Sequence, residues 1–279
     1  MKQARVYLSI ILMFAMLLVQ GCSNNTPTPS SAPESAISAE PFSSEDSPEP
    51  VEIQVFAAAS LTESLTAIQK LYQAKAPEVT LVFNFDSSGT LKTQIESGAQ
   101  ADLFISAAQK QMAGLEEGDY LLTETRKDLL VNKVVMIVPE GSDKGITGFE
   151  DASTDKVELI ALGNSDVPVG QYAQEIYTSL GSWDQIYAKA SLGTNVKEVL
   201  SQVESASVDC GVVYATDATT ASGITVVAEA PAGSHSPVVY PAAVLKTTAS
   251  REAAQAFLEY LTSPEAMAEF EAVGFTAAS

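Results

Sequence analysis

The stretch Val55-Phe56-Ala57-Ala58-Ala59-Ser60-Leu61-Thr62-Glu63-Ser64 joins the pattern of a buried strand to the start of a helix pattern. Valine and phenylalanine favour a strand. Ser60 is a typical helix N-cap residue, and Glu63 completes a capping-box pattern with it. A strand that leads directly into a helix N-terminus directs free N–H groups and a hydroxyl at one point, which suits an anion. A capped helix without a ligand has the same pattern, so this stretch alone leaves both alternatives open.

The same alternation of strand and helix patterns continues from residue 51 to the end of the chain. Strands are predicted at 52–57, 80–85, 103–106, 133–139, 159–162, 210–214, 224–229 and 238–245. Helices are predicted at 60–75, 90–97, 109–117, 170–180, 196–206, 251–261 and 264–273. Strands that alternate with helices of this length predict an α/β fold with parallel sheets.

Two apolar runs, 131–138 and 238–245, indicate chain crossings between two lobes. The first lobe is predicted to contain residues 51–132 and 240–279, and the second lobe residues 133–239. Two lobes that are joined by two crossings can close around a ligand by a hinge motion.

Four further turns offer hydrogen-bond donors where a strand ends or a helix begins. They lie at 86–90, 163–172, 193–198 and 211–217, and the last contains the phenol of Tyr214. The turn at 86–90, taken alone, equally fits a surface turn with a serine cap. Ligands of open α/β sheets bind at the carboxyl ends of strands. We therefore expect all five turns, two from the first lobe and three from the second, to meet at one small anion.

These turns are nearly free of basic side chains, since only Lys197 lies within one of them, and it is expected to point along its helix. Neutral donors suit a fully ionised oxyanion, which offers only acceptors. A protonated oxyanion would leave its O–H without a partner, at a cost of about 1–3 kcal/mol. The pattern therefore predicts a site that selects a dianion.

The first 50 residues carry signals for export and attachment. Lys2 and Arg5 precede an apolar run that ends at Cys22, which predicts a signal peptide at 1–21. The sequence around Cys22 resembles a bacterial lipoprotein cleavage box, in which this cysteine is lipidated; an ordinary secretory signal is the alternative. Residues 22–50 are rich in Ser, Thr, Pro, Ala and Glu, which predicts a disordered tether. We expect an extracytoplasmic protein that a lipid on Cys22 anchors to a membrane.

Composition narrows the possible functions. The chain has 15 basic and 35 acidic residues and a formal net charge of −20, which argues against nucleic acid as a partner. Cys210, in an apolar run, is expected to be a small buried hydrophobe. The sequence has no nucleophile elbow, phosphate-binding lysine loop or zinc-ligand spacing. We therefore expect neither an enzyme nor a cofactor.

The chain resembles the molybdate-binding proteins of bacterial ABC importers. The resemblance covers residues 51–275 and is carried by five segments in the expected order: 55–62, 87–91, 101–107, 167–173 and 211–214. It implies the two-lobed class II periplasmic-binding-protein fold, α/β with two mixed or parallel sheets flanked by helices and two hinge crossings. It also implies that the protein is a monomer, and that its partners are the permease and the ATPase of an importer.

The resemblance further implies that the ligand is tetrahedral molybdate or tungstate. Ser60 and Ser88 would supply hydroxyl and N–H donors, Val169 and Val196 would supply backbone N–H groups, and Tyr214 would supply its phenol. Two positions depart from the family pattern. Asp86 stands beside the second serine pair and is expected to point away from a dianion, and the bulk of Val169 is expected to tighten the pocket. A receptor for another oxyanion such as sulfate is the alternative, and a lipid-anchored enzyme is a more distant one.

Overall fold

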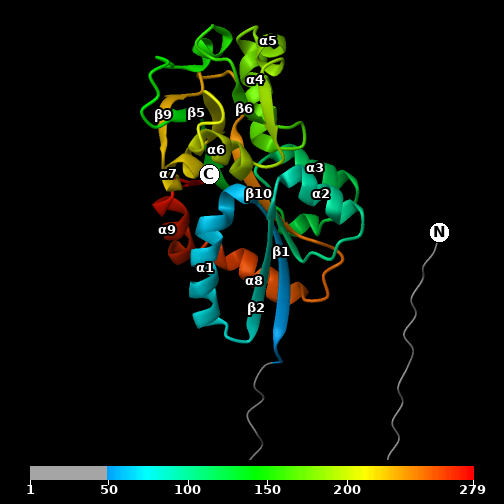
Figure 1. Cartoon of the computed structure of the whole chain (residues 1–279). Helices are drawn as coiled ribbons and strands as arrows, with labels where there is room; N and C mark the ends of the chain where they lie inside the picture. The colour runs from blue at the N-terminus through cyan, green and yellow to red at the C-terminus, as the bar shows by residue number, and fades with distance from the viewer. Residues whose placement is uncertain (1–48) are drawn as a thin grey trace, which may run out of the picture. The chain divides into compact units, whose positions relative to one another are not determined.

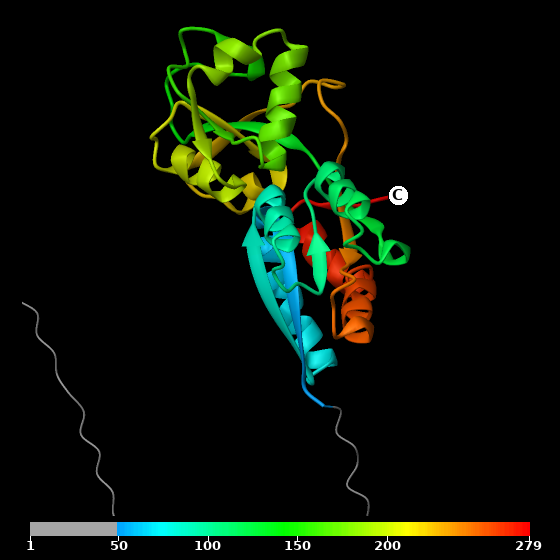
Figure 2. The same cartoon turned by 90° about the vertical axis from the view of Figure 1, so that its right-hand side faces the viewer.

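Two β-sheets organise residues 49–279, the part of the chain that the computed structural model describes (Figures 1 and 2). The first sheet has six strands in the order β11-β4-β10-β3-β1-β2, and the second has five in the order β7-β6-β8-β5-β9. The predicted signal peptide, Cys22 and the tether up to residue 48 lie outside the described residues.

Each sheet is accompanied by its own helices. The first sheet contains β1 (Val51–Ala58), β2 (Val79–Asp86), β3 (Leu103–Ile105), β4 (Lys127–Asn132), β10 (Val238–Val244) and β11 (Thr276–Ala277). Its helices are α1 (Thr62–Lys75), α2 (Ser88–Glu96), α3 (Gln109–Glu117), α8 (Arg251–Tyr260) and α9 (Pro264–Ala272). The short 3-10 helices η1 (Ala59–Leu61) and η2 (Thr123–Thr125) also belong to this part.

The second sheet contains β5 (Val134–Pro139), β6 (Ile160–Gly163), β7 (Ala190–Gly193), β8 (Cys210–Tyr214) and β9 (Ile224–Glu229). Its helices are α4 (Pro168–Ser179), α5 (Trp183–Tyr187), α6 (Val196–Glu204) and α7 (Ala215–Thr220), with the 3-10 helix η3 (Phe149–Ser153) beside α5. Figure 1 shows α4 and α5, which accompany the second sheet, at one end of the described part of the chain, and α1 and α8, which accompany the first sheet, towards the other end.

Both sheets are mixed, so the parallel pairing predicted from the alternation of strands and helices is found in part of each sheet. β1 runs parallel to β2 and β3, and β6 runs parallel to β7 and β8. β10 runs antiparallel to β3 and β4, and β5 runs antiparallel to β8 and β9. The physical reason is that β5 and β10 enter directly from the other sheet and are not linked to their neighbours by a crossover helix. The mixed form that the family resemblance implied is confirmed.

The chain passes between the sheets at two places. β4 ends at Asn132 and β5 begins at Val134, so a single residue joins the two sheets there. The second passage joins Glu229 at the end of β9 to Val238 at the start of β10. The predicted lobe boundaries remain a proposal, to which we return below.

The sequence missed β4, β7 and β11 as well as the short helices α5 and α7. β7 and β11 are edge strands of four and two residues, too short to establish a pattern of their own. β4 lies directly before the apolar run of β5, so the sequence shows one long run where the structure has two strands.

Apolar side chains fill the space between the sheets and their helices. Ile53 and Val55 of β1 and Val212 of β8 are fully buried in one continuous core. Cys210 is also fully buried, as expected, and burial raises the pKa of its thiol to about 12. Among the described residues, no helix combines the length and the apolar character that a membrane span requires.

Candidate functional site

A small cavity lies where strands of both sheets end. The space in it that the centre of a water molecule can occupy is only about 10 Å³, far below the roughly 300–1,000 Å³ of pockets for drug-sized ligands. Its lining comes from the ends of β1, β2 and β8 and from the starts of α2, α4 and α6. The helices α4 and α6 follow β6 and β7, so each of the five turns follows a strand of a parallel set. The predicted meeting point at the carboxyl ends of strands is therefore observed.

Four of the five predicted site residues line this cavity, namely Ser60, Ser88, Val196 and Tyr214. Val169 does not line it, although its neighbours Val167 and Pro168 do. The side chain of Val169 is fully buried in the core, and its backbone N–H is the first of helix α4, because the preceding residue is Pro168. An N–H at that position has no acceptor within its own helix.

Ser60 and Ser88 are buried on the first-sheet side of the cavity. The Oγ of Ser88 accepts a hydrogen bond from the backbone N–H of Ala107 at 2.9 Å. The Oγ of Ser60 lies 2.8 Å from the phenol oxygen of Tyr240. Ser87 serves the helix instead, because its Oγ accepts from the N–H of Thr90 at 3.1 Å and caps α2.

The predicted capping box of Ser60 and Glu63 is wrong. Ser60 lies in η1, α1 begins two residues later at Thr62, and no side chain caps α1. The hydroxyl of Ser60 is engaged with Tyr240, and the carboxylate of Glu63 accepts hydrogen bonds from Lys197. A contact between distant segments replaces the local cap, and this frees Ser60 to face the cavity.

Tyr214 contributes a hydroxyl from the second-sheet side. This oxygen is buried and has no hydrogen-bond partner within residues 49–279. Burial raises the pKa of the phenol well above its ordinary value, so it stays a neutral donor. Leaving a buried polar atom unpaired costs about 1–3 kcal/mol, which a ligand in the cavity would offset.

Val196 is the first residue of α6, and the cap predicted for that helix is confirmed. The Oδ1 of Asn195 accepts from the N–H of Glu198 at 3.1 Å. The carboxylate of Glu198 reaches back to the N–H of Thr194 at 2.7 Å. These contacts fix the start of α6, so the N–H of Val196 is held at the cavity wall.

Two charged side chains lie beside the donors. Asp86 lines the cavity, and its Oδ1 accepts from the N–H of Ser87 at 2.7 Å and from the amide of Asn195 at 3.4 Å. One oxygen of the carboxylate is thus occupied by donors from both sheets. That Asp86 points away from a bound anion stays a prediction.

Lys197 does not point along its helix as expected. Its Nζ lies 2.9 Å from Glu63 of α1 and 3.0 Å from Asp217 of α7. The side chain of Asp217 is fully buried; burial raises its pKa to about 6, and Lys197 partly opposes that shift. Two carboxylates balance the ammonium, so the cavity is served by neutral donors.

Sequence reasoning missed Tyr240 and Asn132, which it used only to mark the crossings. The phenol of Tyr240 accepts from the amide of Asn132 at 3.2 Å, and both residues are buried. The sequence did offer a signal, because each of the two apolar runs contains one of these polar side chains: Tyr240 lies in 238–245 and Asn132 lies in 131–138.

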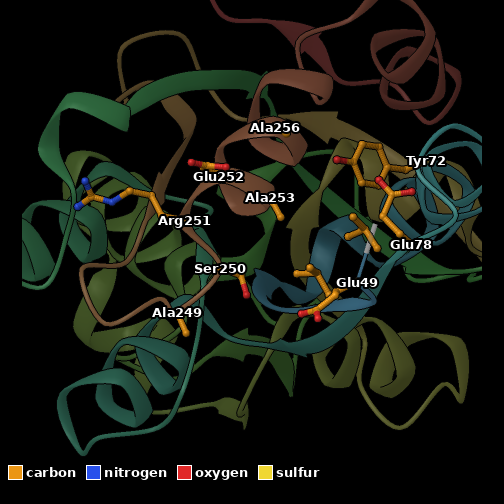
Figure 3. A pocket seen from close by; sticks show the side chains of 11 residues that line it. Glu49, Tyr72, Glu78, Ala249, Ser250, Arg251, Glu252, Ala253 and Ala256 are labelled. Atoms are coloured by element: carbon orange, nitrogen blue, oxygen red, sulfur yellow. The ribbon is translucent and has the colours of Figure 1, made fainter. Parts of the chain in front are cut away.

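A second hollow lies at the start of β1 and shares no lining residue with the cavity of the predicted site (Figure 3). Glu49, Glu78, Glu252 and Arg251 are among the residues that line it. Three carboxylates against one guanidinium make it unsuitable for a dianion. Within residues 49–279, no group of His, Cys, Asp and Glu side chains is arranged to hold a metal ion.

A small, buried, donor-lined cavity between two sheets that are joined by two crossings defines a solute-binding protein. Residues 53–276 match the family of bacterial extracellular solute-binding proteins, and the chain belongs to that family. It is 40% identical over 269 residues to a candidate ABC transporter substrate-binding lipoprotein, YvgL, of Bacillus subtilis, with 96% of each chain covered.

Two further comparisons concern molybdenum. The chain is 39% identical over 229 residues to the molybdate-binding protein ModA of Haemophilus influenzae, which covers 81% of this chain and 90% of that protein. It superposes with a TM-score of 0.64 on the substrate-binding domain of a candidate molybdenum ABC transporter from Clostridium difficile. That structure shares 40% identity and covers 82% of this chain and all of its own. The predicted fold and family resemblance are thus confirmed.

Proposed function

We propose that the protein binds tetrahedral molybdate or tungstate in the cavity between its two sheets and delivers it to an ABC importer. The observation that carries this proposal is the buried hydroxyl of Tyr214, which has no hydrogen-bond partner within residues 49–279 and belongs to a residue that lines the same small cavity as Ser60 and Ser88. The relatives that are named for molybdate support this ligand over sulfate. The N–H groups of Val169 and Val196 complete the proposed set of donors.

Donors alone suit such a ligand. Molybdate and tungstate are dianions whose oxygens accept hydrogen bonds, and neutral hydroxyl and N–H groups satisfy them without a counter-charge. Hydrogen bonds to a charged group contribute about 1.5–3 kcal/mol each. Several such bonds in a small, buried space account for tight binding despite the acidic surface, because salt screens surface charges beyond roughly 8–10 Å.

The two lobes are proposed to be residues 51–132 with 240–279, and residues 133–239. Entry of the anion requires the lobes to part, because the cavity is small and its walls come from both sheets. Closure around the anion is proposed to create the surface that the permease recognises. We further propose that the protein is a monomer without catalytic activity, that a lipid on Cys22 anchors it outside the cytoplasm, and that the importer's ATPase drives uptake.

The test is isothermal titration of residues 47–279, which form one compact unit, with molybdate, tungstate and sulfate. We expect one-to-one binding of molybdate that excess sulfate changes little. Stronger binding of sulfate than of molybdate would change the ligand but keep the site. Absence of binding by all three anions would reject the proposal.

A variant pair then locates the ligand. Ser60→Ala is expected to weaken molybdate binding by about 1.5–3 kcal/mol, or roughly 10- to 150-fold, because a donor to a charged group is lost. Ser64→Ala is the matched control, since Ser64 is equally buried but donates to the carbonyl of Leu61 and does not line the cavity. An affinity of Ser60→Ala within about threefold of wild type, below the smallest expected loss, would remove Ser60 from the site.

A further inference from the structure

A chain of buried hydrogen bonds connects the first crossing between the sheets to the cavity. The amide nitrogen of Asn132, the last residue of β4, lies 2.9 Å from the hydroxyl of Thr216 in α7. The same nitrogen lies 3.2 Å from the phenol oxygen of Tyr240 in β10. The phenol oxygen in turn lies 2.8 Å from the Oγ of Ser60, and all four residues are buried.

The direction of this chain follows from its first member. The Oδ1 of Asn132 accepts from the N–H of Lys133 at 2.8 Å, so the other end of the side chain is the NH₂ group. Its two protons go to Thr216 and Tyr240, and the phenol of Tyr240 is therefore an acceptor on that side.

The single proton of the Tyr240 phenol then has one destination. Burial raises the pKa of this phenol well above its ordinary value, so the proton is retained. Within residues 49–279, Ser60 at 2.8 Å is the remaining partner with hydrogen-bond geometry, and the phenol of Tyr214 is a further neighbour, whose pKa is raised by burial and also by Tyr240. If Ser60 donated instead, the phenol proton would have only Tyr214, whose oxygen makes no hydrogen bond of good geometry, and a buried proton without an acceptor costs about 1–3 kcal/mol. Tyr240 therefore donates to Ser60, and the hydroxyl proton of Ser60 is left for the cavity.

We propose that Asn132 and Tyr240 are positioning residues that fix the hydroxyl of Ser60 as a donor and so make the site select fully deprotonated oxyanions. The inference rests on the proposed function, with Ser60 as a ligand to the anion. Ser88 is oriented in the same way, because its Oγ already accepts from the N–H of Ala107. Each serine keeps one free lone pair, but its hydroxyl proton is directed to the cavity, so each serine presents a donor to the anion.

The proposal predicts a change in selectivity as well as in affinity. Tyr240→Phe removes the donor to Ser60, so both lone pairs of the Oγ become free and its hydroxyl proton is no longer directed to the cavity. The Oγ can then accept from an anion with an O–H. Monohydrogen phosphate is such an anion, and molybdate at neutral pH is not. Loss of Tyr240 should therefore weaken molybdate binding and favour monohydrogen phosphate relative to molybdate.

The experiment is a double-mutant cycle by isothermal titration at pH 8 with molybdate and then with phosphate. Tyr240→Phe is expected to weaken molybdate binding about 2- to 10-fold, the range of one neutral hydrogen bond, and to narrow the preference for molybdate over phosphate at least as much. In the Ser60→Ala background the same change should alter molybdate affinity less than about twofold, because Tyr240 acts through Ser60. Tyr177→Phe is the matched control: this buried tyrosine packs on Phe149 in the second-sheet core.

A second variant tests the direction of the chain. Asn132→Asp replaces the NH₂ group by an acceptor, so Tyr240 would donate to residue 132 and Ser60 would donate to Tyr240. Molybdate affinity should then fall more than it does in Tyr240→Phe. Three results would each overturn the inference if wild type binds molybdate. The first is that Tyr240→Phe weakens molybdate binding equally with and without Ser60. The others are an unchanged preference for molybdate over phosphate in Tyr240→Phe and an unchanged molybdate affinity in Asn132→Asp. A wild type that does not bind molybdate would reject the proposed function itself.

Discussion

Gly89 donates its backbone N–H to the carbonyl oxygen of Asp166 at 3.1 Å, from helix α2 beside the first sheet to the loop before α4 beside the second. A Cβ atom on residue 89 would lie 2.1 Å from that oxygen. The contact therefore requires glycine for its lack of a side chain. Other contacts between the same parts of the molecule include those from Lys197 to Glu63 and from Asn195 to Asp86.

Gly89→Ala is expected to weaken molybdate binding at least about tenfold, because relieving the overlap with Asp166 takes a backbone shift that costs a few kcal/mol. Alanine is the better helix former, so the free energy of unfolding should be unchanged or higher by up to about 1 kcal/mol. Isothermal titration and urea denaturation together separate the two effects.

The matched control is Gly114→Ala in α3. A Cβ there would meet only the end of the flexible Lys92 side chain, which can move aside. Wild-type affinity in Gly89→Ala, or equal losses in both variants, would show that the Gly89–Asp166 contact is not part of the bound state.

Ser88→Ala should affect binding and stability together. The variant removes a proposed donor to the anion and also leaves the N–H of Ala107 buried without its acceptor. We expect molybdate binding to weaken roughly 10- to 150-fold and the free energy of unfolding to fall by about 1–3 kcal/mol. Titration and urea denaturation measure the two losses, and Ser263→Ala, which removes the cap of α9 and does not line the cavity, serves as the comparison for stability alone.

Ser60→Ala is expected to lose stability as well, because it leaves the phenol proton of Tyr240 buried without its acceptor. A variant Ser88→Ala with weakened binding and full stability would mean that the N–H of Ala107 finds another acceptor. Full affinity would exclude Ser88 from the ligand set.

The sequence predicted most of the fold because its central strands are apolar runs with clear ends. The runs at 52–57 and 210–214 correspond closely to β1 and β8, and the helices α1, α2, α4 and α6 were placed within a few residues, whereas α7 was missed. Mixed sheets were not derivable from this alternation. Strand direction depends on which sheet a strand enters from, and that is a property of tertiary topology.

Local patterns found the site residues whose role is local and missed those whose role is tertiary. Asn195 caps its own helix, and its motif predicted this correctly. Ser60 has the same kind of motif, yet its hydroxyl meets Tyr240, which is 180 positions away in the sequence. No spacing rule connects residues so distant, so Tyr240 and Asn132 became visible only in the structure.

Asp217→Asn should remove a pH-dependent loss of stability. Burial raises the pKa of Asp217 to about 6 from a reference value of 3.8, so the folded protein binds this proton more tightly than the unfolded chain. The contribution of Asp217 to the free energy of unfolding is therefore fully present below about pH 4. It is lost as the pH rises towards about 6, by on the order of 2–3 kcal/mol. The variant should match wild type near pH 4 and be more stable above pH 6.

Urea denaturation of both proteins between pH 4 and pH 8 measures this difference. Asp209→Asn provides a control of opposite sign. Burial alone would raise the pKa of Asp209, but hydrogen bonds from Lys144 and two backbone N–H groups lower it overall, so this variant should lose stability at neutral pH. A difference between wild type and Asp217→Asn that does not vary with pH would contradict the assignment.

Glu63→Gln tests the ion pair that joins the two sheets without disturbing the pair of Lys197 with Asp217. The Lys197 and Glu63 side chains are 29% and 42% exposed, so the pair is expected to contribute only about 0.2–1 kcal/mol. The pair forms only when the two proposed lobes are closed around the anion, so its loss should weaken molybdate binding. The affinity should fall by at most about fivefold at low salt. Salt screens the pair, so the difference in molybdate affinity from wild type should shrink at 1 M salt.

Titration at both salt concentrations measures this difference. Glu96→Gln is the control, since Glu96 pairs with Lys92 inside α2 alone. An affinity loss that is the same at both salt concentrations would show that Glu63 acts through packing, and equal losses in the two variants would show that the pair between the sheets has no special part in closure.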